Sequence, residues 1–318
     1  MRIVFCGTPE FAVPTLRRLL AEPDFAVEAV VTQPDRPRGR GQQVASSAVK
    51  DLALDAGLYV YQPETIKSDS AYEFFKRLTP DAVVIIAYGQ IIPARLLEIP
   101  RRGWINLHAS LLPKYRGAAP VNWAILNGET RTGLTTIQID PGLDSGPILL
   151  QQALEIGADE IAPELARRLA AAGAPLVVET LRKLDRSEIT PVPQDHTQAT
   201  LAPMLKKEDG RIRWSLPAPQ IYNHIRGLEP WPGAFTTFRG QLCHVWGSPT
   251  TGFTAPESSA AVGAPPGTLL AEKGMLYVAC GDLTWVELAA VQLEGRKRVA
   301  GRDFANGARL TWGEQFHS

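Results

Sequence analysis

The stretch DAVVIIAY, residues 81–88, is an almost unbroken apolar run rich in β-branched side chains. Such a run is typical of a strand that is covered on both faces, as in a parallel sheet packed between helices. AVEAVVTQ (26–33) has the same character, and RIVFCG (2–7) is a shorter run of this kind that ends at a glycine. These three segments predict strands of an open α/β sheet.

Segments with a helical apolar pattern lie between and beyond these strands. They are FAVPTLRRLLA (11–21), SSAVKDLALDAG (46–57), SAYEFFKRL (70–78), PVNWAILNG (120–128) and a long region over roughly residues 160–184. Pro14 is compatible with its helix because it falls in the first turn. WINLHAS (104–110) and GLTTIQID (133–140) add further strands. The alternation predicts a doubly wound, mostly parallel α/β domain over residues 1–185.

Residues 186–205 interrupt this pattern. Their sequence, RSEITPVPQDHTQATLAPML, is rich in Pro, Ser, Thr and Gln and has no apolar period, which is typical of a linker. Beyond it, APQIYNHIRGL (218–228) predicts one helix, and short segments such as QLCHVWGS and MLYVACGD predict strands between Gly and Pro turns. We therefore expect a small, OB-like β-barrel over residues 206–318.

Composition narrows the class of protein. The 318 residues contain 33 Lys and Arg against 33 Asp and Glu, so net charge points to no polyanionic partner. The three cysteines are far apart and form no CxxC pair, which favours reduced, core-filling thiols in a cytoplasmic protein. No apolar run approaches bilayer length, no secretory leader precedes the first strand, and no His or Cys cluster suggests a metal site. A single glycine, Gly7, follows the first strand, so a dinucleotide fingerprint is absent.

The segment NLHASLLPKYRG (106–117) places an amide and an imidazole at a strand end. Side chains alternate along a strand, so Asn106 and His108 are expected on the same face, at the edge where open α/β sheets bind ligands. DPGLDSGPIL (140–149) supplies a carboxylate, Asp144, after another strand. Considered alone, Asp144 would more often cap a turn. Taken together, the three groups suit addition of an amine to a carbonyl carbon without a metal.

A series of motifs extends over nearly the whole chain. They are FCGTPEFA, TQPDRPRGRG, AYGQIIP, NLHASLLPKYRGAAP, GLDSG, KEDGRIRWS and PWPGA. Together they resemble the folate-dependent formyltransferases, and the charged TQPDRPRGRG loop and the C-terminal domain resemble the branch that acts on methionyl-tRNA. The resemblance implies transfer of the formyl group of 10-formyltetrahydrofolate to the α-amine of initiator methionyl-tRNA. The product, N-formylmethionyl-tRNA, would serve translation initiation.

The same resemblance implies roles for particular residues. Asn106 and His108 would stabilise the developing oxyanion, His108 would also take part in proton transfer, and Asp144 would hold His108. The predicted folate-binding residues lie in two loops: Tyr88 and Gly89, and Ser110, Leu111, Leu112 and Pro113.

Basic residues form the third group implied by the resemblance. Arg36, Arg38 and Arg40 lie in a Pro- and Gly-rich segment that we expect to form no regular element. From composition alone this is an ordinary solvated basic loop; the resemblance implies that it enters the tRNA acceptor stem. Lys206 and Lys207, with a second cluster at residues 296–298, would contact phosphates.

Two other functions remain open at this point. A related transferase or hydrolase could use the same folate on a small amine or on water. A folate- or tRNA-binding protein without turnover is a different class, and the intact Asn106, His108 and Asp144 argue against it. We expect a monomer.

Overall fold

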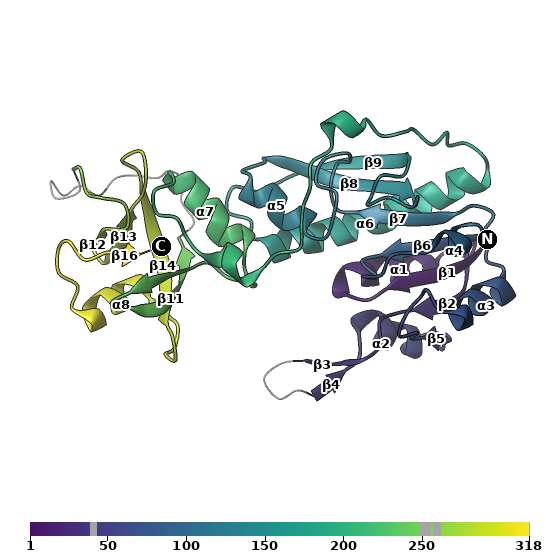
Figure 1. Ribbon diagram of the computed structural model, residues 1–318, viewed down its shortest axis with the longest axis horizontal. Helices are drawn as coiled ribbons and strands as arrows, with labels where there is room; N and C mark the ends of the chain where they lie inside the picture. Colours follow the sequence, from purple (N-terminus) through teal and green to yellow (C-terminus); the bar gives the residue numbers. More distant parts are fainter. Residues whose placement is uncertain (39–42, 249–255, 257–261, 318) are drawn as a thin grey trace. The chain divides into compact units, whose positions relative to one another are not determined.

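The structure, a computed structural model, describes residues 1–38, 43–248, 256 and 262–317 (Figure 1). The chain forms two compact units. Unit 1 consists of Met1–Pro120, Arg131–Glu155 and Ala166–Ala202. Unit 2 consists of Val121–Thr130, Ile156–Leu165 and Pro203–Ser318. Most of the segment expected as a linker, up to Ala202, thus belongs to unit 1.

Unit 1 is built on a seven-stranded sheet with the order β5-β2-β1-β6-β7-β8-β9. Its strands are β1 (Arg2–Gly7), β2 (Ala26–Val31), β5 (Val60–Tyr61), β6 (Ala82–Ile86), β7 (Trp104–His108), β8 (Arg131–Gln138) and β9 (Ile148–Glu155). The pairs from β5 to β7 are parallel, and β8 and β9 are added antiparallel. The predicted mostly parallel α/β domain is confirmed. The edge strand β9 was not predicted, because its sequence ILLQQALE mixes apolar and polar residues, as suits a half-exposed edge.

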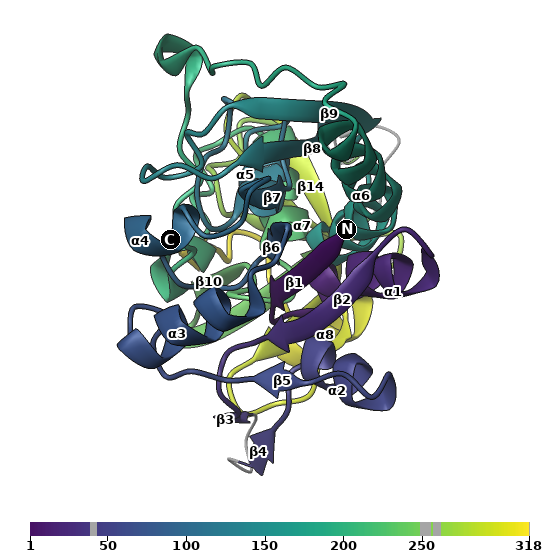
Figure 2. The same cartoon turned by 90° about the vertical axis from the view of Figure 1, so that its right-hand side faces the viewer.

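Helices cover both faces of this sheet. They are α1 (Val13–Ala21), α2 (Ala48–Asp55), α3 (Asp69–Leu78), α4 (Ala94–Leu97) and α6 (Ala162–Asp185), with 3-10 turns at Glu10–Ala12 and His196–Gln198. Figure 2 shows α1 and α6 on one side of the strands and α3 and α4 on the other. Ser47 and Ser68 cap α2 and α3, each accepting a hydrogen bond from a backbone N–H three residues ahead. β6 is buried along its whole length because helices pack on both faces of the sheet, and this burial explains its unbroken apolar sequence.

Unit 2 contains an antiparallel barrel. Its strands follow the order β12-β13-β14-β11-β10-β16, with β15 paired to β14. They are β10 (Phe235–Phe238), β11 (Gln241–Gly247), β12 (Leu269–Glu272), β13 (Met275–Ala279), β14 (Trp285–Leu293), β15 (Val299–Ala300) and β16 (Phe316–His317). The two ends of the path meet at an antiparallel bridge between Thr268 and Gln315, where the N–H of Leu269 donates to the carbonyl of Glu314 over 2.8 Å. This bridge closes the predicted barrel.

The remaining elements of unit 2 are helical. They are α5 (Pro120–Leu126), a 3-10 turn at Lys207–Gly210, α7 (Ala218–Gly227) and α8 (Gly301–Ala308). Phe304 of α8 packs edge-on against Phe238 in the barrel core, with ring centroids 5.2 Å apart. Among the described residues, no helix is both long and apolar enough to cross a membrane.

The three cysteines are buried free thiols, as expected. Burial raises the pKa of Cys6 well above its ordinary value and raises the pKa of Cys243 and of Cys280 to about 12. They remain protonated at neutral pH and act as small apolar side chains.

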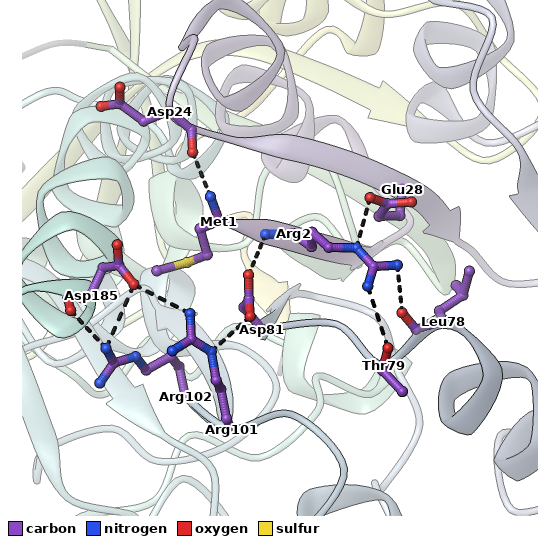
Figure 3. Close-up of polar contacts among 10 residues, drawn as sticks. All are labelled: Met1, Arg2, Asp24, Glu28, Leu78, Thr79, Asp81, Arg101, Arg102 and Asp185. Atoms are coloured by element: carbon purple, nitrogen blue, oxygen red, sulfur yellow. Dashed lines mark hydrogen bonds and ion pairs between the residues drawn. The ribbon is translucent and has the colours of Figure 1, made fainter.

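A polar cluster holds the edge of the unit 1 sheet where the parallel strands begin (Figure 3). The carboxylate of Asp81 accepts the backbone N–H of Arg2 over 2.7 Å and the Nε–H of Arg101 over 2.7 Å. The Arg2 guanidinium donates to Glu28 over 3.0 Å and to the carbonyl of Leu78 over 2.7 Å. The pKa of Asp81 is lowered mainly by the hydrogen bond from the Arg2 backbone, with a smaller contribution from Arg101.

We expect Asp81→Asn to lower the free energy of unfolding by about 1 kcal/mol at pH 7. A carboxylate whose pKa is depressed in the folded state stabilises that state above its unfolded pKa, about 3.9 for Asp, and the effect is lost as pH falls through the folded value. Urea unfolding should therefore show the variant converging on the wild type below about pH 4. Glu73→Gln, at an ion pair within α3 whose carboxylate is 67% exposed, is the control and should leave stability unchanged. A difference for Asp81→Asn that does not shrink as the pH falls below about 4 would contradict the assignment.

Candidate active site

Asn106 and His108 lie at the carboxyl end of β7, the strand at which the pairing of the sheet changes from parallel to antiparallel. Asn106 pairs with Ile85 on one side and with Ile137 on the other, and His108 pairs with Thr135. Because Asn106 is paired on both sides and His108 is paired with β8, the backbone is fixed and both side chains project from the same face. The imidazole of His108 is 6% exposed and the Asn106 side chain is half-buried.

Asp144 comes to these groups from the loop between β8 and β9. Its Oδ1 accepts the side-chain N–H of Asn106 over 3.4 Å, and its Oδ2 lies 3.6 Å from Nδ1 of His108. Both distances are at or beyond the long end for a hydrogen bond. Oδ2 also accepts the backbone N–H of Gly117 over 2.9 Å. The structure thus brings together all three predicted groups, from segments far apart in sequence.

The other edge of the imidazole faces the backbone. Nε2 of His108 lies 2.8 Å from the carbonyl oxygen of Tyr115. A carbonyl oxygen only accepts, so this contact requires a proton on Nε2, and a doubly protonated ring would satisfy both this carbonyl and the Asp144 carboxylate. The ring is therefore held from both sides.

Sequence reasoning missed the contributions of Tyr115 and Gly117. Both act through backbone groups, which every residue carries, so no side chain marks either role. The one signal is glycine at 117: its φ is +121°, and a Cβ there would lie 2.7 Å from the carbonyl oxygen of Ala202. Only glycine fits that position without displacement.

The residues predicted to bind folate at 110–113 form a tightly bonded turn beside His108. The Ser110 hydroxyl donates to the carbonyl of Lys114 over 2.6 Å, and the Ser110 carbonyl accepts from the Thr135 hydroxyl over 2.7 Å. The N–H of Leu112 donates to the same hydroxyl over 3.1 Å. Ser110 and Leu112 are buried, whereas Leu111 and Pro113 are half-buried. The turn is thereby locked onto β8, and its side chains at 110 and 112 point into the protein.

Tyr88 and Gly89 lie in the loop that follows β6. The side chain of Tyr88 is 2% exposed, and burial raises the pKa of its hydroxyl. Within the described parts of the chain that hydroxyl has no hydrogen-bond partner. The Tyr88 carbonyl accepts from Gln33 Nε2 over 3.0 Å. Gly89 has a φ of +89°, and Ala87 before it one of +47°, so the peptide groups of this loop turn away from the strand ladder.

The basic segment after β2 differs from expectation. Arg36–Arg38 (β3) and Gln43–Ala45 (β4) form a two-stranded antiparallel ribbon, so the prediction of no regular element is wrong. Pro37 is compatible with it because each strand of an isolated ribbon has a free edge. Arg36 is exposed; Arg40 lies outside the described residues, and of Arg38 only the backbone is described. Asp35, at the base of the ribbon, accepts hydrogen bonds from Lys50 and Gln62. The pKa of Asp35 is lowered, and the hydrogen bond from Lys50 makes the largest contribution.

Other predicted basic residues lie in unit 2. Lys206 and Lys207 are exposed where the 3-10 turn Lys207–Gly210 begins. Arg298 places its guanidinium 3.9 Å from the centre of the Trp246 ring, which orients it by a cation–π contact. Among the residues that the structure describes, no three His, Cys, Asp or Glu side chains gather as metal ligands would.

Known proteins match this chain over nearly its whole length. A family model described as Formyl transferase matches residues 1–181, and one described as Formyl transferase, C-terminal domain, matches residues 204–309. The methionyl-tRNA formyltransferase of Solibacter usitatus (strain Ellin6076) is 54% identical over 316 residues, covering 99% of this chain and 98% of that protein. The methionyl-tRNA formyltransferase of Acidobacterium capsulatum is 50% identical over 311 residues, covering 98% of this chain and 97% of that protein.

Solved structures agree on the fold. WlaRD, a sugar 3N-formyl transferase crystallised in the presence of dTDP and 5-N-formyl-THF, is similar with a TM-score of 0.65 and 16% identity, covering 93% of this chain and 99% of that one. HypX from Aquifex aeolicus, in complex with tetrahydrofolic acid, is similar with a TM-score of 0.60 and 15% identity, covering 96% of this chain and 47% of that one. Given the two family models and the relatives of 50% identity and more, the chain belongs to the formyl transferase family and, within it, to the methionyl-tRNA formyltransferases.

Proposed function

We propose that this protein transfers the formyl group of 10-formyltetrahydrofolate to the α-amine of initiator methionyl-tRNA, giving N-formylmethionyl-tRNA for translation initiation. The observation that carries this proposal is the 54% identity, over 99% of the chain, to the methionyl-tRNA formyltransferase of Solibacter usitatus. The convergence of Asn106, His108 and Asp144 supports it, because these groups suit acyl transfer to an amine. Since charged tRNA is the substrate, we place the activity in the cytoplasm.

The donor would bind beside β7, in the loops that contain Tyr88–Gly89 and Ser110–Pro113. The irregular backbone after β6 offers peptide N–H and C=O groups of the kind that pair with the edge of a flat heterocycle. The rigid turn at 110–113 would serve as a wall, with Leu111 and Pro113 as its more exposed members. The residues present therefore fit a folate, which would supply the formyl group when bound.

Asn106 and His108 would stabilise the oxygen of the formyl group as it gains negative charge. The described contacts engage one N–H of the Asn106 amide, and the other remains for that oxygen. His108 would contribute positive charge in its protonated form and exchange a proton with the reacting nitrogen. Asp144 would orient the ring and stabilise its protonated form, a role that suits a carboxylate 3.6 Å from Nδ1.

The acceptor would be held by basic residues in both units. Arg36, Arg38 and Arg40 would contact the acceptor stem, where the planar guanidinium suits phosphates and base edges. Lys206, Lys207 and the cluster at residues 296–298 would contact phosphates. In functional terms we assign residues 1–185 to catalysis and residues 206–318 to tRNA binding, in a monomer.

The direct test mixes pure protein with 10-formyltetrahydrofolate and either methionyl initiator tRNA or small primary amines. We expect N-formylmethionyl-tRNA as the product and no comparable transfer to the small amines. Release of formate without transfer would identify a hydrolase, and transfer to a small amine alone would identify a related transferase. Binding of folate without any turnover would leave a binding protein.

Asp144→Asn should slow formyl transfer by about 10²-fold or more while leaving folding and folate affinity unchanged. The amide keeps the shape of the carboxylate and loses its negative charge, so the lost contribution is electrostatic. Asp140→Asn is the matched control in the same loop: Asp140 accepts from the Gly142 N–H over 3.0 Å and the Ser145 hydroxyl over 2.8 Å, which an amide oxygen also does. Single-turnover rates of formyl transfer, measured for both variants, provide the comparison. Wild-type turnover in Asp144→Asn would reduce Asp144 to a turn residue.

Arg36→Ala should weaken binding of methionyl-tRNA and lower the slope of log affinity against log salt by about one, because one phosphate contact is lost. Folate affinity should not change, since the folate loops are separate segments. Arg77→Ala is the control, because Arg77 is also exposed and lies at the end of α3, near the end of the sheet where the parallel strands begin. Affinities measured at two salt concentrations test this. An unchanged slope in Arg36→Ala would exclude the β3–β4 ribbon from tRNA contact.

A further inference from the structure

Gln194 is a buried amide in a segment whose neighbours are exposed. Its side chain is 6% exposed, whereas the residues on either side face solvent. Nε2 donates to the carbonyl oxygen of Asp144 over 2.8 Å and to that of Gly146 over 2.7 Å. Oε1 accepts from the Arg116 guanidinium, from Nε over 3.1 Å and from Nη2 over 2.6 Å. Both donors and both acceptor sites of the amide are therefore used.

The two carbonyls that Gln194 binds belong to the loop that presents Asp144. The backbone of Asp144 has a φ of +48°, a left-handed conformation that is unfavourable for an L-residue and persists only where the surroundings impose it. Gly146 packs so closely that a Cβ on it would lie 1.8 Å from the carbonyl oxygen of Gln138. The loop is thus pressed against the end of β8 on one side and bonded to Gln194 through its carbonyls.

Backbone pairing on both sides of Gln194 fixes its own position. Val192 and Ile148 form an antiparallel bridge with hydrogen bonds of 2.8 and 2.9 Å. Further on, the N–H of Arg116 donates to Thr200 over 2.8 Å, and the N–H of Ala202 donates to Arg116 over 2.7 Å. Arg116 itself is buried, and its Nη2 also lies 3.1 Å from Nδ1 of His196. The amide is therefore a fixed support.

We infer that Gln194 is a positioning residue for formyl transfer: it holds the backbone of residues 144–146 so that the Asp144 carboxylate meets His108, Asn106 and the N–H of Gly117. A buried amide with only a structural role needs hydrogen-bond partners, but these can lie anywhere in the protein. Both N–H donors of Gln194 instead bind carbonyls in the loop that carries Asp144, one on each side of Ser145. The expected effect on the rate of formyl transfer rests on the proposed function, whereas the expected effect on the structure of the loop rests on geometry alone.

The structural consequence is tested without any substrate. Gln194→Met keeps the length of the side chain and removes all of its hydrogen bonds. Gln198→Met is the matched control, because Gln198 lies in the same segment, is exposed, and donates to the nearby Asp195 carboxylate over 2.7 Å. In the full-length protein, followed by NMR, the Gly117 amide should exchange with solvent about 10-fold faster or more in Gln194→Met, since its acceptor, Asp144 Oδ2, is displaced. Gln198→Met should match the wild type.

The kinetic consequence is a loss of rate without a loss of binding. Gln194→Met should lower the single-turnover rate by about 10-fold to 10²-fold, because small misplacements of a catalytic group have effects of this size. The KM values for folate and tRNA should stay within about threefold. In an Asp144→Asn background the same change should have little further effect, since it acts through Asp144.

Several results would overturn the inference. These are wild-type exchange of the Gly117 amide in Gln194→Met, a wild-type rate of transfer, or effects of Gln194→Met and Asp144→Asn that multiply. If Gln194→Met does not fold, Gln194→Glu takes its place: the carboxylate retains the Arg116 contact and removes the donors to Asp144 and Gly146, so both effects should persist, and a wild-type result would again refute the inference. A wild-type protein that transfers no formyl group refutes the proposed function instead, while the exchange measurement still decides the role of Gln194.

Discussion

The Asp144 carboxylate is the acceptor on which the arrangement of the site depends. A carboxylate only accepts hydrogen bonds, so it can gather donors from segments that otherwise have no reason to meet. Here it faces Asn106 and His108 from β7 and the backbone N–H of Gly117 from the turn that follows. The Tyr115 carbonyl from that same turn then binds the far edge of the imidazole. The orientation of His108 is thus fixed by one acceptor on each side.

A carboxylate gathers hydrogen-bond donors at both ends of the strands in the unit 1 sheet, but in different surroundings. Where the strands begin, Asp81 gathers the Arg2 backbone and the Arg101 side chain, and Arg101 is largely exposed to solvent. Water screens such contacts, so they contribute modestly to stability. Where β7 ends, His108 is almost fully buried, and electrostatic interactions between poorly solvated groups are stronger. The same kind of carboxylate can therefore fasten strands at one end of the sheet and, in the function that we propose, stabilise charge at the other.

Part of this arrangement could be predicted from sequence, because part of it depends on side-chain type and period. The apolar runs of β1, β2 and β6 indicated a sheet with two covered faces, and strand alternation put Asn106 and His108 together. The types of the three side chains also suggested addition of an amine to a carbonyl carbon. Their individual catalytic roles and the folate and tRNA contacts came from the family resemblance and remain proposals. The contributions of Tyr115 and Gly117 could not be predicted, because backbone groups leave no side-chain pattern.

The remaining failures came from pairing that is not local. The β3–β4 ribbon was missed because its strands are short and lie in a sequence rich in proline and glycine, which is typical of loops. β9 was missed because its sequence mixes apolar and polar residues. Gln194 lies in a stretch whose composition indicated a linker, and its burial depends on the bridge from Val192 to that unpredicted strand.

Loop placement sets the precision that such a site can reach. Asn106 and His108 lie on a strand paired on both sides, so the sheet itself determines where their side chains project. Asp144 has no such ladder: it lies in a connection with a left-handed backbone, and a loop is ordinarily more mobile than the strands that it joins. The least fixed of the three groups limits the geometry of the whole set. A buried amide bonded to the carbonyls of Asp144 and Gly146 gives the loop the support that pairing gives β7, which is why we place the control of the site geometry in Gln194.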